Sequence, residues 1–430
     1  MDRQALLPPE RLYSACCRWR ATKAKRDCYF VTLRNPYPFV ASLLITNVRI
    51  VESGQRLYSG DVLVRDGRIA AAGKIEAAAA AGAERLNGNG RLLTPGLIDV
   101  HTHGVMHALY DTPEGMLEAA RVLGQFGVTT VLPTIVPQMK EGWAKGLEAV
   151  AAAIPSVRGV NIPGLHLEGP FMAIGGAACP TLPGDLGLLE EMLSACLNRV
   201  TVMSISPDTP NIIPVIERLR EKKITVFLTH TRASVEQSEA AIAAGAVHAT
   251  HFYDVFYAPA ESDPGVRPTG VVETVLAHRH VSVDFIADGV HVHPMAIRAA
   301  IAAKGPEGII LITDSNIGAG LPPGVYDTKW GFQIRIKEGD GARHITKNSL
   351  AGSALTMNRG IANLTKWLKL PSEQIWAMGS TNPARLLGLG NTGRIQAGAD
   401  ADLVLWEDDF QPVKTWVKGE CSYEKKDISV

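Results

Sequence analysis

The stretch GLIDVHTH, residues 96–103, decides the fold expected for this chain. It begins as a short apolar run of the kind that forms a buried strand and ends in two histidines, His101 and His103. Side chains at positions i and i+2 of a strand project to the same side, so these two imidazoles can chelate one cation. Because barrel enzymes carry their catalytic groups at the C-terminal ends of strands, polar residues that end an apolar run indicate a site.

Apolar runs of similar length recur along the chain and are separated by segments that are mostly predicted to be helical. The helical segments include 114–126, SVEQSEAAIAAGA after His230, and PMAIRAAIAAKG after His293, where Pro294 suits a first helical turn. Eight strands that alternate with helices predict an α/β fold with a TIM-like (β/α)8 barrel, and a doubly wound sheet is the structural alternative. The further runs are GVTTVLPT (127–134), IPGLHLEG (162–169), TVMSISP (201–207), ITVFLTH (224–230), AVHATHFY (246–253), HVSVDFIAD (280–288) and GIILITDS (308–315).

The two ends of the chain show the period-two alternation of half-buried strands. LLITNVRIV and DVLVRDGRIAAAG lie near the start, and Asp66-Gly67 favours a tight hairpin turn within the second stretch. ADLVLWE (401–407) and PVKTWVKGE (412–420) alternate in the same way near the end. We therefore expect a small β-sandwich domain from residues 41–95 and 385–425, a catalytic barrel from 96–384, and a weakly ordered extension over 1–40.

Composition narrows the class of protein. Among 430 residues, Lys+Arg and Asp+Glu both number 43, so no net charge favours nucleic acid or an anionic membrane as a partner. The chain has no apolar run long enough to span a bilayer, and its six cysteines form no CxxC pair, which favours a soluble protein in the reducing cytoplasm. The basic segment within 1–40 lacks a signal-peptide pattern; an upstream stretch translated in error and a transit segment remain alternatives.

Polar residues also end or closely follow five other predicted strands, which strengthens the case for a metal site. An imidazole and carboxylate set suits zinc or iron better than magnesium or calcium. Asp314 is the candidate general base and acid of an amide hydrolysis, and His291 would polarise the carbonyl oxygen or, alternatively, orient Asp288. No GxSxG elbow, phosphate loop or dinucleotide fingerprint is present. The five residues are Glu168, His230, His251, His291 and Asp314.

The ordered series of motifs from about residue 42 to 420 resembles the amidohydrolase superfamily and, within it, the N-acetylglucosamine-6-phosphate deacetylases. The motifs are PGLIDVHTHG, GLHLEGPF, a histidine after the fifth strand, ATHFY, ADGVHVHP, ITDS, LAGSALTM and NPARLLGL followed by GADADLVLW. The resemblance implies a deacetylase of an N-acetyl amino sugar in carbohydrate metabolism, with a small-molecule substrate, one or two divalent ions, and a homo-oligomer, expected to be a dimer.

The same resemblance implies roles for individual residues. His101 and His103 with Glu168 would hold one metal, and Glu168, His230 and His251 would hold a second. Asp314 would be the catalytic base and acid. His291 would contact the substrate carbonyl.

The sequence departs from the family where the phosphosugar is bound. Asp254 and Val255 stand where family members usually carry an Asn-Ala pair, and an acid there would repel a phosphate. The arginine expected before Pro264-Gly265 is missing, although Arg267 lies close by, and Ala178-Cys179 replaces a histidine. We take His291, Asp254, Val255 and Arg267 as candidate substrate-binding residues. The motifs of amide cleavage are complete, whereas the requirement for the 6-phosphate is open.

Two other functions stay open from the sequence. The first is hydrolysis of another N-acyl compound or of a cyclic amide; a dihydroorotase-like site usually bridges its metals with a modified lysine, and Glu168 argues against that form. The second is a non-catalytic barrel that serves as a binding protein, which the complete set of ligands disfavours.

Overall fold

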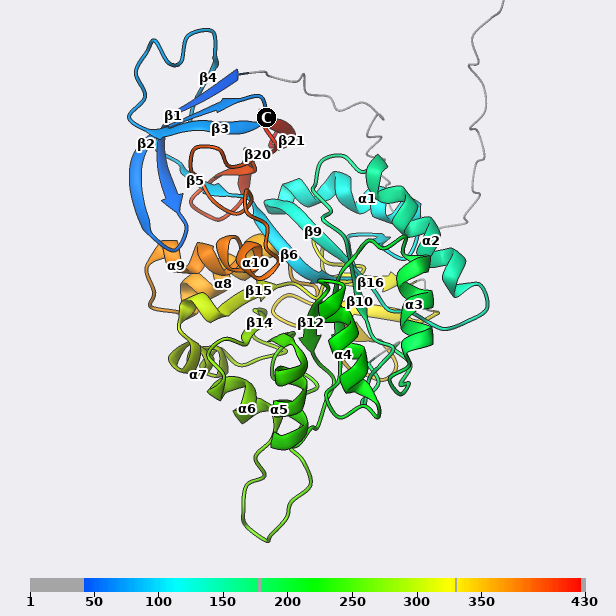
Figure 1. Ribbon diagram of the computed structural model, residues 1–430. Helices are drawn as coiled ribbons and strands as arrows, with labels where there is room; N and C mark the ends of the chain where they lie inside the picture. Colours follow the sequence, from blue (N-terminus) through cyan, green and yellow to red (C-terminus); the bar gives the residue numbers. More distant parts are fainter. Residues whose placement is uncertain (1–41, 177–178, 329–330, 427–430) are drawn as a thin grey trace, which may run out of the picture. The chain divides into compact units, whose positions relative to one another are not determined.

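The computed structural model describes residues 42–176, 179–328 and 331–426 (Figure 1). The expected extension over 1–40 and Ala178 lie outside these residues. Within the described part, no helix is long and apolar enough to cross a membrane.

Eight parallel strands form the sheet that carries the barrel, and each lies within one of the eight apolar runs predicted from the sequence or extends at most one residue beyond it. Their order in the sheet is β15-β14-β13-β12-β11-β10-β9-β6, so barrel strands that are consecutive in the sequence are hydrogen-bonded neighbours. A hydrogen bond of 2.8 Å from the Asp314 amide to the His101 carbonyl joins the ends of the first and last strands. The strands are β6 (Leu97–Thr102), β9 (Val128–Ile135), β10 (Leu165–Glu168), β11 (Val200–Ile205), β12 (Thr225–Leu228), β13 (Ala246–Ala249), β14 (Ser282–Ile286) and β15 (Ile309–Ile312).

The helices between these strands pack on the outside of the sheet (Figure 1). Their ends follow local sequence rules: Thr112 and Ser234 cap α1 and α5 with their side chains, and Pro294 opens α7 as predicted. The helices are α1 (Pro113–Val122), η1 (Leu123–Phe126), α2 (Trp143–Ala153), η2 (Ile154–Ser156), α3 (Leu186–Ala195), α4 (Ile212–Glu221), α5 (Val235–Ala244), α6 (Val271–Ala277), α7 (Pro294–Lys304) and η3 (Pro306–Gly308). After β15 follow α8 (Met357–Trp367), α9 (Ser372–Met378) and α10 (Thr381–Leu386).

The two faces of the barrel strands differ in what they bury. In β10, Leu165 and Leu167 join the large apolar cluster shared with the helices. The alternate residues face polar groups instead: His166 contacts Ser204 on β11, and Glu168 contacts His103 after β6. This alternation places carboxylates and imidazoles inside the barrel while the strands remain apolar towards the helices.

The two ends of the chain, which were expected to form a β domain, contribute strands to one eight-stranded sheet. Strands from both ends are neighbours in it, since β19 pairs with β5, and β2 and β3 meet at the predicted Asp66-Gly67 turn. Trp406 packs against Gly127, where a Cβ would lie 2.2 Å from its ring, and so couples this sheet to the barrel. The strands are β1 (Ser42–Glu52), β2 (Arg56–Arg65), β3 (Arg68–Gly73), β4 (Glu84–Asn87), β5 (Leu92–Pro95), β19 (Leu403–Trp406), β20 (Pro412–Val417) and β21 (Glu420–Glu424).

Two small sheets were not predicted from the sequence. The strands β7 (Gly104–Val105) and β8 (Ala108–Leu109) form a short hairpin directly after β6. A three-stranded sheet of β16 (Gly324–Asp327), β17 (Gln333–Ile336) and β18 (Arg343–His344) follows β15. Both lie on the side of the barrel where the strands end, because both follow the C-terminal end of a barrel strand.

Candidate metal centre and active site

Six side chains from five barrel strands converge at the C-terminal end of the barrel. His101 lies in β6, His103 is the first residue after it, Glu168 ends β10, and the other three lie two residues beyond β12, β13 and β15. Two groups within this set have donor atoms that all lie within 4.8 Å of one another: His101 with Glu168 and His251, and His101 with His103 and Asp314. The later three residues are His230, His251 and Asp314.

Glu168 lies at the middle of this cluster. Its Oε1 atom is 3.4 Å from the Nε2 atoms of both His230 and His251 and 3.7 Å from that of His101. Its Oε2 atom is 3.2 Å from Nε2 of His103. Asp314 Oδ1 closes the other side, 3.3 Å from His103 Nε2. The two oxygens of one carboxylate therefore face two different sets of imidazoles.

Hydrogen bonds on the far side of each ring fix which imidazole nitrogen faces the cluster. Nδ1 of His103 lies 3.2 Å from the carbonyl oxygen of Thr134, and Nδ1 of His251 lies 3.2 Å from that of Asp254. Since a carbonyl oxygen only accepts, Nδ1 must carry a proton, and Nε2 is the nitrogen that faces Glu168 and is left to bind a metal ion.

His101 is oriented by a longer chain of bonds. Its Nδ1 is 2.8 Å from the hydroxyl of Thr250, and that hydroxyl donates to a carboxylate oxygen of Asp284 at 2.9 Å. The hydroxyl must then accept from His101, so Nδ1 is protonated and Nε2 again faces the cluster. A metal-ligating histidine commonly donates its second N–H in this way.

The backbone is strained at three of the six residues. His230, His251 and Asp314 have φ of 47°, 35° and 45°, in the left-handed region that residues with a Cβ rarely adopt. Backbone hydrogen bonds hold Asp314 in place, from its amide to His101 and from the Ser353 amide to its carbonyl, both 2.8 Å. Such strain is costly and collects at functional sites, where the surrounding structure enforces it.

The donor set fits a divalent metal ion. His101 Nε2, which faces the cluster, is a buried atom without a hydrogen-bond partner in the described part of the chain, which is unusual for a buried polar group. Burial opposes protonation of His103 and His251, but the neighbouring carboxylates outweigh it and raise the pKa of each imidazole to about 10. Burial would raise the pKa of Glu168, yet the surrounding histidines hold it well below its usual range. The carboxylates thus attract a positive charge to this point, and a divalent cation supplies it.

A comparison with protein-family models identifies the group to which the chain belongs. The model described as the amidohydrolase family matches residues 92–421. The chain belongs to the amidohydrolase family. This confirms the resemblance inferred from the motifs, and members of the family are generally metal-dependent.

Among proteins of this family, the chain is similar to curated relatives and solved structures that are named N-acetylglucosamine-6-phosphate deacetylases. The chain is 36% identical over 343 residues to the N-acetylglucosamine-6-phosphate deacetylase of Vibrio furnissii, covering 77% of this chain and 83% of that protein. It is 31% identical to the enzyme of the same name from Lysinibacillus sphaericus, covering 86% of this chain and 95% of that protein. The fold is similar to that of a Mycobacterium smegmatis N-acetyl-D-glucosamine-6-phosphate deacetylase variant crystallised with N-acetyl-D-glucosamine-6-phosphate, with a TM-score of 0.77 and 26% identity over 90% of this chain and 100% of that one.

Of the candidate substrate-binding residues of this amidohydrolase, His291 has a buried side chain with a charged partner. The His291 side chain is only 2% exposed, and its Nδ1 lies 2.7 Å from Asp288 Oδ2, so the predicted pair with Asp288 is present. Burial lowers the pKa of His291, but the hydrogen bond to Asp288 outweighs it, and Asp254 and Asp314 are near enough to raise the pKa further.

The other three candidate substrate residues take no direct part in the cluster. Asp254 accepts from His251 through its backbone carbonyl, and Val255 accepts the Thr231 amide in the same way. Arg267 has a side chain that is 82% exposed and pairs with Glu273 at 2.5 Å. Within the described part of the chain, the structure does not bring Arg267 to the carboxylates and histidines.

Asp284 and Thr250 were not identified from the sequence, although they hydrogen-bond His101 and His251 on the side away from the cluster. The Asp99 carboxylate accepts from the Thr313 hydroxyl at 2.6 Å and from the His101 amide at 3.4 Å. His166 Nε2 lies 2.6 Å from the Ser204 hydroxyl, and the centroid of its ring is 4.7 Å from that of His101. These groups hold the strand ends rather than face the cluster.

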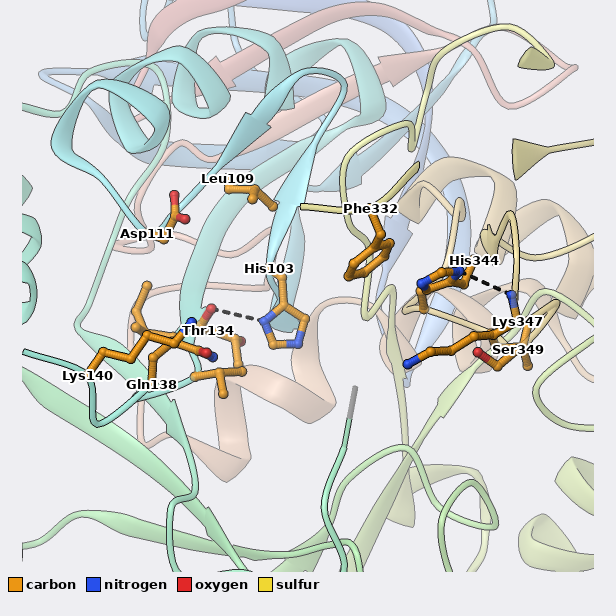
Figure 2. Close-up of a pocket in the computed structure, with 14 residues that line it drawn as sticks. His103, Leu109, Asp111, Thr134, Gln138, Lys140, Phe332, His344, Lys347 and Ser349 are labelled. Carbon is orange, nitrogen blue, oxygen red and sulfur yellow. Dashed lines mark hydrogen bonds between the residues drawn. The ribbon is translucent and has the colours of Figure 1, made fainter. Parts of the chain in front are cut away.

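A cavity of about 450 Å³ opens directly beside the cluster, with His103 in its wall (Figure 2). One side is formed by the end of β9, with Thr134, and by the chain after it, with Lys140. The other side is formed by the segment around β17 and β18, with Phe332 and Lys347. This volume is in the range of small-molecule sites. The cavity therefore gives a substrate access to the candidate metal centre.

Proposed function

We propose that this chain is a metal-dependent hydrolase that cleaves the amide of an N-acetyl amino sugar and releases acetate. The observation that carries the proposal is the Glu168 carboxylate, which lies between four imidazoles with Asp314 on the adjoining side. The deacetylase names of the curated relatives support the substrate class. A cavity beside His103 supports access by a molecule of sugar size.

His101, His103, Glu168, His230 and His251 would hold the metal. We propose zinc or iron, as one or two ions, because the donors are imidazole nitrogens and carboxylate oxygens. When bound, such an ion polarises the amide carbonyl and lowers the pKa of water. The same proposal includes a homodimer and a cytoplasmic location, both expected from the resemblance to the family.

Asp314 is proposed as the general base and acid. Its carboxylate takes the proton of the attacking water and returns it to the nitrogen of the leaving amine. The imidazoles around Asp314 keep it ionised, since their hydrogen bond and charges lower its pKa despite burial. His291, held by Asp288, donates towards the carbonyl oxygen as negative charge develops there.

The test is acetate release by the purified protein, with its metal content measured, for the wild type and for Asp314→Asn. We expect about one ion or two per chain and a loss of at least about a hundredfold in kcat, because the amide cannot accept the proton. Metal analysis of the variant separates loss of the base from loss of a ligand. The proposal would be contradicted if the purified protein contained no metal and if wild type and variant released acetate at the same rate from N-acetylglucosamine and from its 6-phosphate.

A further inference from the structure

The cavity beside His103 carries two lysines from segments far apart in the sequence. Lys140 lies between β9 and α2, and Lys347 lies in the turn that follows β18. Figure 2 shows them on either side of His103. They line the same cavity as a proposed metal ligand, so one small molecule in it can contact both the metal centre and a lysine.

These two ammonium groups are available to a ligand. No ion pair or side-chain hydrogen bond of Lys140 or Lys347 is present among the residues that the structure describes, whereas Arg267 is paired with Glu273. The other ionisable groups in the cavity wall are His103, His344 and one acid, Asp111. Lys140 and Lys347 therefore give this cavity two cationic side chains against one acid.

Ring stacking and hydrogen bonds hold the part of the cavity wall next to Lys347. The ring of Phe332 stacks on that of His344, with centroids 4.5 Å apart and planes 15° apart. Nδ1 of His344 accepts the backbone amides of Thr346 and Lys347 at 3.2 Å and 3.3 Å, which fixes the turn that carries the lysine. An aromatic face beside ordered polar groups is typical of sites that bind a ring with polar substituents.

We propose that this cavity binds an anionic substituent of the substrate through Lys140 and Lys347, while the acetamido group lies at His103. The substrate class is an N-acetyl amino sugar that carries a phosphate or a carboxylate. The inference rests on the proposed function and adds the residues that set its specificity.

The test compares three sugars: N-acetylglucosamine, its 6-phosphate, and N-acetylmuramic acid, which carries a carboxylate. The variants are Lys140→Met, Lys347→Met and the double variant, with Lys145→Met on α2 as a matched exposed lysine. The readout is the ratio of kcat/KM for each anionic sugar to that for the neutral one. Competitive inhibition by inorganic phosphate measures anion binding without turnover.

We expect the wild type to prefer one anionic sugar, and each lysine variant to reduce that preference by about tenfold, since a charge-assisted hydrogen bond is lost. The preferred sugar distinguishes phosphate from carboxylate. The inhibition constant of phosphate should rise in the double variant and stay the same in Lys145→Met.

Other outcomes overturn the inference. One is a wild type whose kcat/KM is no higher for an anionic sugar than for the neutral one. Another is a preference for an anionic sugar that the double variant keeps, or that only Arg267→Ala removes. A wild type that binds metal but releases acetate from none of the sugars overturns the proposed function, and the subsite with it. Activity that is indifferent to both lysines overturns the subsite alone.

Discussion

At the scale of single residues, Asp284 determines how two of the proposed metal ligands are held. Its fully buried carboxylate accepts from Thr250, which orients His101, and from the backbone amide of His251 at 2.5 Å. It is also 2.8 Å from Nε2 of His248. One carboxylate therefore fixes a ring tautomer and a strained backbone at the same time.

We expect Asp284→Asn to weaken metal binding by roughly tenfold to a hundredfold, as is usual when the partner of a ligating histidine is changed. The amide has one accepting oxygen and cannot serve Thr250, His248 and the His251 amide together. The measurement is a titration of metal-free protein with zinc against a competing chelator.

Ser282→Ala is the matched control, because Ser282 lies on the same strand and bonds His248 at 2.7 Å without contacting a proposed ligand. Its metal affinity should equal that of the wild type. Equal affinities for Asp284→Asn and the wild type would show that Asp284 does not position the ligands.

The proposed ligands were predictable from sequence because each ends or closely follows an apolar run, and the ends of parallel strands meet at one edge. The structure brings His101, His103 and Glu168 together in this way. Asp284 lies inside the run HVSVDFIAD, where nothing distinguishes it from a strand-interior acid. Its contact with Thr250 depends on the register of β13 and β14, which pattern alone does not fix.

At the scale of elements, Lys304 joins three segments of the barrel wall. It ends α7, is only 2% exposed, and donates to the carbonyls of Val275, His278 and Val281 at 2.5, 2.9 and 2.7 Å. These carbonyls lie at the end of α6 and in the chain that leads to β14. The side chain thus satisfies acceptors that the helix end leaves unpaired.

We expect Lys304→Met to lower the free energy of unfolding by roughly 2–4 kcal/mol, because the apolar stem is kept while three buried carbonyls lose their donor. Denaturant unfolding of both proteins measures the difference. The exposed Lys369 supplies the comparison: Lys369→Met should change stability by less than about 0.5 kcal/mol. A loss no larger than that in Lys304→Met would contradict the role assigned to the three bonds.

The elements that line the substrate cavity were less predictable than the barrel itself. The eight strands and their order followed from the alternation of apolar runs and helices. The sheet of β16, β17 and β18 has strands of four, four and two residues, too short for a periodic signal. Phe332 and Lys347 are brought to His103 by this insertion, so their role in the cavity could be found only from the structure.

At the scale of the whole described region, Asp402 joins the barrel to the terminal sheet. Its carboxylate accepts from the side-chain amide of Asn161, whose backbone bonds to β9, at 2.9 Å, and from the Lys418 amide at 2.8 Å. Burial raises the pKa of Asp402 to about 6. A carboxyl group with a raised pKa favours the folded state below its unfolded pKa of about 4, and this contribution is lost as the pH rises through 6.

Asp402→Asn should therefore be more stable than the wild type at pH 8, by roughly 3 kcal/mol for a difference of about two pKa units. Asparagine has no charge to bury, and its oxygen can still accept the Lys418 amide. The advantage should shrink as the pH falls through 6 and vanish near 4, which unfolding measurements across this range would follow. Asp408→Asn, at a side chain that is 96% exposed, should show no such trend. If Asp402→Asn were less stable by the same amount at pH 4 and pH 8, its two hydrogen bonds, rather than the buried charge, would govern the junction.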